Sequence, residues 1–289
     1  MILGISILLA FGAMLFWAFG DFFIQRSTRK IGDLESLAVI GIIGSIILLP
    51  FVWQDIGLLW SMQNLVLLGV LGVFVFIMSL LNFEALKEGK LSIIDVIITI
   101  ELPVTVALSI IFMKESLSVY QFMLMGMMII GLVLTATKSF SHWKTKLERG
   151  VILAILAAIL MGLVNFLTAV SSKTISPLLA IWIPWVIFTV ICMVVIIRKG
   201  ELKKFGKNIS QFKSLLIITG VVDTLAWVFY SYATKRYDIA IITAITECYP
   251  AVAMFLGLWL NREHIRWYQY IGAILALIGS IILALTVNI

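Results

Sequence analysis

Charged residues are scarce in this chain, at 12% of its 289 residues, whereas hydrophobic residues make up 62%. It has only two cysteines, Cys192 and Cys248, and two histidines, His142 and His264. These are too few and too widely spaced for a disulfide framework or a metal site, so we expect no metal, cofactor or catalytic residue. A chain this apolar cannot stay in water as a monomer, and we predict that it lies in a lipid bilayer.

The apolar residues fall into ten stretches of roughly 20 residues, and each is long enough for a helix to cross a hydrocarbon core about 30 Å thick. The predicted spans are 2–25, 35–54, 62–86, 90–113, 119–137, 149–170, 176–197, 213–234, 238–260 and 266–287. Lipid offers no partner for free backbone amides, so the spans must be helices. We predict an all-α, multi-pass protein of the plasma membrane, and the polar stretches 138–149 and 198–213 are expected to be surface loops.

The sequence repeats itself at an interval of 148 residues. Within positions 84–136, 13 of 53 residues are identical to the residue 148 positions later, whereas unrelated sequences of this composition would share about four or five. The matches include Lys87 with Lys235, Glu115 with Glu263, Tyr120 with Tyr268, Gln121 with Gln269, and Gly131 with Gly279. Each copy contains five predicted spans, and an odd number places the second copy upside down. We therefore predict two inverted five-helix repeats, residues 1–138 and 149–289, the organisation of many secondary transporters.

Basic residues are distributed unevenly among the loops. The loops after the first, third, fifth, seventh and ninth spans hold 17 Lys and Arg, and the remaining loops with both chain ends hold 4. The positive-inside rule places the basic loops in the cytoplasm and both chain ends outside. This bias accounts for the net charge of +6, so we expect anionic lipid headgroups rather than nucleic acid at the basic face.

The two halves share a pattern around their fourth and fifth spans. Pro103 and Pro250 lie in the fourth and ninth spans, and Glu115 and Glu263 close those spans. A Gln then opens the next span, and a Gly follows ten residues later. With the ten spans in two halves, this pattern resembles the EamA-type transporters of the drug/metabolite transporter superfamily over essentially the whole chain. Pro103 pairs with Ala251, a slip of one residue, so the two halves are not exact copies.

The resemblance implies a ten-helix secondary transporter, and many such relatives look as if both ends are cytoplasmic, opposite to the orientation that the loop charges favour. Glu115 and Glu263 lie beside Lys114 and Arg262 at span ends. We therefore interpret both as structural residues in the membrane interface. Small residues let membrane helices approach closely, so the glycines of the fifth and tenth spans are expected to pack helices; a dimer face there is the alternative, and the chain is either a monomer or a homodimer.

Four acidic residues lie at or near the middle of their predicted spans: Asp95 and Glu101 in the fourth, Asp223 in the eighth and Glu247 in the ninth. Asp21 lies deeper in the first span than its last turn. Placing a charged side chain at this depth costs about 2.5 to 3.5 kcal/mol on insertion scales. Because of this cost, we interpret acids at this depth as functional residues. No Lys or Arg lies at a comparable depth. Anionic substrates such as sugar phosphates are therefore disfavoured, because they need cationic partners.

Polar and aromatic residues recur at helical spacing beside these acids. Pro250 removes a backbone donor, so the ninth span is expected to kink beside Glu247 and to expose the carbonyl of Thr246. The rings of Trp17, Trp227 and Tyr230 either stack on an organic cation or pack the helices. The predicted substrate-binding residues are Trp17, Asp21, Asn82, Glu101, Asn165, Asp223, Trp227, Tyr230, Thr246 and Glu247.

Apolar surroundings favour the neutral form of a carboxyl group, so we expect Glu247, and after it Asp223, to couple transport to protons. The expected function is efflux of a small neutral, zwitterionic or cationic metabolite, such as an amino acid, by alternating access. A multidrug or quaternary-cation exporter and an uncoupled facilitator are the alternatives. An intramembrane aspartyl protease is disfavoured because no Gly-x-Gly-Asp motif is present, and ATP-driven transport because the chain has no phosphate-binding loop.

Overall fold

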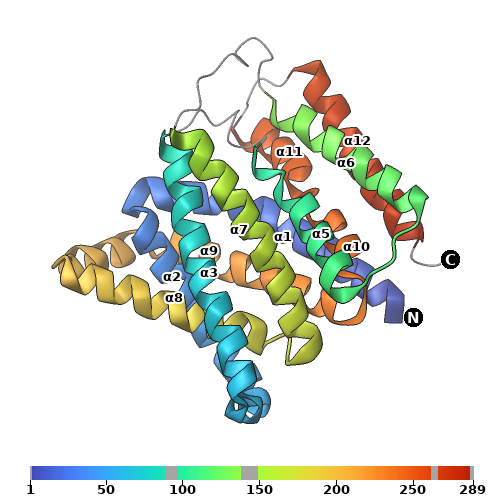
Figure 1. Ribbon diagram of the computed structural model, residues 1–289. Coiled ribbons are helices and arrows are strands. Elements are labelled where there is room, and N and C mark those ends of the chain that lie inside the picture. Colours follow the sequence, from blue (N-terminus) through green and yellow to red (C-terminus); the bar gives the residue numbers. More distant parts are fainter. Residues whose placement is uncertain (1, 89–96, 138–148, 262–265, 287–289) are drawn as a thin grey trace.

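The computed structural model describes residues 2–88, 97–137, 149–261 and 266–286, and these residues form helices without strands (Figure 1). The helices of the first half are α1 (Ile2–Ile31), α2 (Asp33–Val52), the short 3-10 helix η1 (Trp53–Trp60), α3 (Met62–Glu88), α5 (Glu101–Met113) and α6 (Val119–Ala136). Those of the second half are α7 (Arg149–Thr174), α8 (Leu179–Arg198), α9 (Leu202–Arg236), α10 (Ile239–Thr246), α11 (Tyr249–Asn261) and α12 (Trp267–Thr286).

Nine stretches of the described chain are long and apolar enough to cross a membrane, one of them formed jointly by α10 and α11. The fourth predicted span, 90–113, is described from Ile97 onward, and it contains α5. The predicted all-α, multi-pass architecture is confirmed. Many large apolar side chains remain exposed on the outer surface, for example Ile46, Phe112 and Trp267, as expected for helices whose outer faces contact lipid.

The prediction of a loop at 198–213 is wrong for most of its length. Helix α9 begins at Leu202 and continues into the eighth span through a kink at Phe212, where φ is −114° and ψ is 21°. Lysine is a good helix former, and Lys203, Lys204 and Lys207 remain exposed while Phe205 is buried. The segment is polar enough to resemble a loop in sequence, but its one buried ring holds it as a helix.

Equivalent helices of the two halves meet each other in opposite directions. In the α6–α12 pair, Gln121 at the start of α6 donates to the hydroxyl of Thr286 at the end of α12 (3.2 Å). Conversely, Gln269 at the start of α12 donates to the backbone carbonyl of Thr135 near the end of α6 (2.8 Å). Because α6 and α12 are the fifth helices of their halves, this antiparallel contact is direct structural support for an inverted repeat (Figure 1).

Glycines allow the backbones of α6 and α12 to touch. A Cβ atom at Gly272 would lie 2.5 Å from the carbonyl oxygen of Gly131, and a Cβ at Gly131 would lie 2.6 Å from that of Gly272. A Cβ at Gly279 would contact Met128 of α6 at 2.6 Å. These three glycines therefore pack helices within the chain, as predicted, whereas a Cβ at Gly126 would meet nothing within 4 Å.

The fourth and ninth spans are interrupted at equivalent positions. Residues 99–100 form a turn immediately before α5, and residues 247–248 form a turn between α10 and α11; these pairs are 148 residues apart. The same short hydrogen bond closes both turns, from Ile100 N to Ile97 O (3.0 Å) and from Cys248 N to Ile245 O (3.3 Å). The expected kink beside Pro250 is therefore a break between the half-helices α10 and α11, and the first half has an equivalent turn immediately before α5.

Candidate functional site

Two buried carboxyl groups meet where the broken helices face each other. Glu101 begins α5 and Glu247 follows the last residue of α10, and their side chains are 4% and 5% exposed. The two carboxyl groups are close enough to interact directly, and we call them the carboxyl pair. A hydrogen bond between two carboxyl groups forms only when one of them carries a proton, since an ionised carboxylate only accepts. The pair therefore combines one acid from each half of the fold.

Helix α7 holds the carboxyl pair from the side. The amide Nδ2 of Asn165 donates to Oε1 of Glu247 (3.2 Å). The hydroxyl of Thr105, one turn after Glu101, donates to the backbone carbonyl of Gly162 (3.0 Å) and so ties α5 to α7. A Cβ at Gly162 would lie 2.8 Å from the carbonyl oxygen of Glu101. Glycine at this position thus lets α5 approach closely enough to place Glu101 beside Glu247.

A second layer of hydrogen bonds supports Asn165. The buried hydroxyl of Tyr230 on α9 lies 3.1 Å from the backbone carbonyl of Asn165 and 2.9 Å from the hydroxyl of Thr243 on α10. Thr246, also predicted as a binding residue, is fully buried, and its hydroxyl donates to the carbonyl of Thr243 (3.0 Å). This network links α7, α9 and α10 and orients the groups around Glu247.

Aromatic rings extend from the carboxyl pair toward α2 and α8, and we call them the aromatic cluster. The ring of Trp17 lies 5.1 Å from that of Trp227, 5.5 Å from that of Tyr230 and 6.2 Å from that of Tyr249. Trp185 of α8 continues the cluster, 5.8 Å from Trp227. The three rings predicted from the sequence are therefore brought together, and tilted and edge-on pairs of this kind are energetically favourable.

Two more of the predicted acids, Asp21 and Asp223, interact with each other, and Asp21 also acts on Glu101 of the carboxyl pair. Asp223 of α9 is 8% exposed, and Asp21 of α1 is exposed. Asp21 is close enough to act electrostatically on both Asp223 and Glu101. Among the described residues, the buried ones include Glu35, Glu101, Asp223 and Glu247 but no Lys or Arg. The described interior therefore holds acidic groups without a buried basic side chain.

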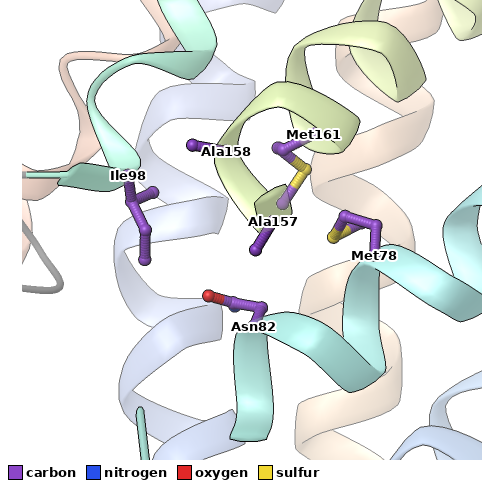
Figure 2. A pocket seen from close by; sticks show the side chains of 6 residues that line it. All are labelled: Met78, Asn82, Ile98, Ala157, Ala158 and Met161. Carbon is purple, nitrogen blue, oxygen red and sulfur yellow. The ribbon is translucent and has the colours of Figure 1, made fainter. Parts of the chain in front are cut away.

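Asn82 lies elsewhere. It lines a small pocket between α3 and α7, together with Met78, Ile98, Ala157, Ala158 and Met161 (Figure 2). Its amide group points into this mainly apolar pocket, toward Ile98 and Ala157. Asn165 donates a hydrogen bond to Glu247, whereas Asn82 lines this pocket. The two asparagines, which the sequence grouped together, therefore occupy different surroundings.

The contacts of Glu115 differ from those expected. Its carboxylate accepts the backbone N–H groups of Ile239 (2.7 Å) and Ala240 (3.0 Å), the first residues of α10. It is a structural residue, as interpreted from the sequence, but it acts on the opposite half of the fold. Its partner by repeat, Glu263, and the predicted intramembrane acid Asp95 lie outside the described residues.

Sequence reasoning missed Trp185 and Tyr249, and it did not place Thr243 in the predicted binding set. Tyr249 is the residue 148 positions after Glu101, so the repeat itself pointed to it. The described part of the chain contains no group of three His, Cys, Asp or Glu arranged to hold a metal ion.

A polytopic helical bundle with inverted halves, two broken helices and acids at the breaks is the architecture of a secondary transporter. The sequence profile of the EamA-like transporter family matches residues 4–137 and 148–285. The chain belongs to the EamA-like transporter family, and it is a multi-pass membrane transporter of the drug/metabolite type. Members of this family are transporters rather than enzymes.

The chain is also similar to two other proteins. A segment of 130 residues is 32% identical to an uncharacterized protein of Methanocaldococcus jannaschii, covering 45% of this chain and 94% of that protein. That relative is about as long as one half of this chain. A solved crystal structure of a protein superimposes with a TM-score of 0.80 at 14% identity, covering 98% of this chain and 97% of the other, and it shows the likeness of fold.

Proposed function

We propose that this transporter exchanges protons for a small neutral, zwitterionic or cationic metabolite, such as an amino acid, and exports it across the plasma membrane. The observation that carries the proposal is the carboxyl pair, Glu101 with Glu247, buried at the two helix breaks and supported by Asn165. A site that holds acidic groups without a buried Lys or Arg among the described residues favours substrates with a positive group.

Alternating access supplies the coupling in this proposal. When the site opens to water on one side, the pair releases its proton and binds the cationic group of the substrate; when it opens on the other side, the reverse occurs. Glu247 is the first choice for the exchanging group, because it receives the hydrogen bond of Asn165 and ends α10, where the helix dipole favours a positive partner. Asp223 is the second choice.

The test uses the purified chain in proteoliposomes. A thermal-shift screen of amino acids and amines identifies a ligand, since a compound that binds the folded state stabilises it in proportion to its occupancy. Uptake of the labelled ligand is then measured with and without an imposed pH gradient. We expect Glu247→Gln to lose accumulation driven by the gradient while it still exchanges labelled for unlabelled ligand.

Glu201→Gln is the matched control, because Glu201 lies outside the spans and pairs at the surface with Lys204 (3.7 Å). If Glu247→Gln accumulates the ligand at every pH as the parent does, the coupling role is wrong. If the parent itself never accumulates ligand against a gradient and only equilibrates it, the chain is an uncoupled facilitator.

The aromatic cluster favours a second candidate, an exporter of lipophilic or quaternary cations. Rings in contact with one another around a negatively charged site suit a delocalised cation. Competition between labelled amino acid and tetraphenylphosphonium separates the two candidates. Strong inhibition by the lipophilic cation, lost in Trp227→Ala, would favour the second candidate.

A further inference from the structure

Helix α10 is held at its first turn by a residue of the other half. A helix begins with backbone N–H groups that have no partner within the helix. In α10, two of these groups, on Ile239 and Ala240, donate to the two carboxylate oxygens of Glu115, at 2.7 and 3.0 Å. The preceding residue, Asp238, occupies the usual capping position but makes no side-chain capping bond. The cap therefore comes from the segment that follows α5.

The same end of α10 is also tied to α7. The ammonium group of Lys173, near the end of α7, donates to the backbone carbonyl of Tyr237 (2.6 Å). The segment after α5, the end of α7 and the start of α10 thus meet at one end of the bundle, in the lower half of Figure 1. We call this meeting point the Glu115 end.

Helix α10 connects the Glu115 end to the carboxyl pair. It contains 8 residues and is immediately followed by Glu247. Its residues are all buried, and they pack among helices of both halves. A rigid element this short transmits a shift at its first turn to its last turn, so the position of Glu247 depends on what holds Ile239 and Ala240.

We propose that Glu115 is a positioning residue whose carboxylate closes the bundle at the Glu115 end and fixes Glu247 opposite Glu101. Opening at this end requires α10 to leave the carboxylate. A charged cap that accepts two N–H groups favours the closed arrangement both through hydrogen bonds and through the helix dipole. The inference rests on the proposed alternating access, and it assigns to Glu115 the contact that must break and re-form in each cycle.

The test measures access to Cys248, the residue after Glu247. Cys248 is fully buried, and the only other cysteine, Cys192, is replaced by Ala so that Cys248 alone reports. The full-length chain is labelled with a small, membrane-impermeant thiol reagent, added from one side of sealed proteoliposomes of known orientation and then from the other. The rates are compared in the parent, Glu115→Gln and Glu115→Ala, with Glu201→Ala as the control.

Loss of a charged cap corresponds to a shift of about five- to thirtyfold in the closed-to-open ratio. We expect Glu115→Ala to raise the labelling rate by that factor from the Glu115 end only, Glu115→Gln to raise it less because one acceptor oxygen remains, and Glu201→Ala to leave it unchanged. A general loosening of the fold would raise labelling from both sides, and that result would overturn the proposal.

Unchanged labelling in both Glu115 variants would also overturn it. If Glu115→Ala does not fold, Glu115→Gln decides the question alone. The labelling uses no substrate and no pH gradient, so its failure leaves the coupling role of Glu247 standing. Conversely, failure of the Glu247→Gln transport test leaves the labelling result interpretable as a statement about closure.

Discussion

At the crossing of α6 and α12, we predict that replacing one glycine by alanine destabilises the fold and that replacing another stabilises it. We expect Gly272→Ala to destabilise the chain, because the new methyl group would lie 2.5 Å from the carbonyl oxygen of Gly131 and 2.7 Å from the backbone nitrogen of Thr135. Both atoms belong to the backbone, so no side-chain rotation relieves the contact. The helices must separate, which also weakens the hydrogen bond from Gln269 to the Thr135 carbonyl.

The magnitude follows from two opposing effects. Forcing extra atoms into a packed contact costs typically 1 to 3 kcal/mol of stability. Because the clash here is with backbone atoms, we expect a cost at the upper end of this range, about 3 kcal/mol. Replacing Gly by Ala inside a helix returns roughly 1 kcal/mol, so the net loss is about 2 kcal/mol. Gly126 of the same helix pair has nothing within 4 Å of its Cβ position, so Gly126→Ala should show only the gain of roughly 1 kcal/mol.

The assay is thermal unfolding of the purified chain in one detergent, followed by intrinsic tryptophan fluorescence. Each kcal/mol shifts Tm by roughly 2 to 4 °C in proteins of this size range, so the two variants should differ by about 6 to 12 °C, with the parent between them. Equal Tm values for the two variants, or a Gly272→Ala variant more stable than the parent, would show that α6 and α12 do not touch here.

Two further predictions concern other contacts. Tyr230→Phe removes the hydrogen bonds to Thr243 and to a carbonyl of α7, and we expect the free energy of unfolding to fall by about 1 kcal/mol, measured as a lower Tm. Tyr232→Phe, at an exposed ring, should change the Tm little, and equal effects of the two variants would contradict the network. Burial and the neighbouring Glu115 raise the pKa of Asp238. The carboxyl group of Asp238 therefore binds its proton more tightly in the folded chain than in the unfolded chain. As a result, the folded chain loses stability as pH rises from the usual aspartate pKa to the raised one. Asp238→Asn should therefore match the parent in Tm at pH values below that window and exceed it above the window, and a difference that is constant with pH would refute the assignment.

Much of the architecture follows from local properties of the sequence. The spans are visible because a bilayer demands a minimum run of apolar residues, and the inversion follows from five spans per copy. The break beside Glu247 was predictable because Pro250 cannot donate a hydrogen bond. The equivalent break before Glu101 was less visible, since Pro103 is displaced by one residue from the repeat position of Pro250. The helix at residues 202–211 was missed because its polar composition concealed the buried ring of Phe205.

The sequence by itself determined that this chain is a membrane protein, that its halves are duplicated and inverted, and that several acids lie at bilayer depth, because hydropathy, repetition and span number are properties of the chain alone. Only the tertiary structure decided that Glu247 meets Glu101 and Asn165, that Asn82 lies apart, and that Glu115 holds the start of α10. Helical periodicity gives the face on which a residue lies but not which helix covers that face. Which helices meet is set by close approaches such as those at Gly162 and Gly272, between residues far apart in the sequence.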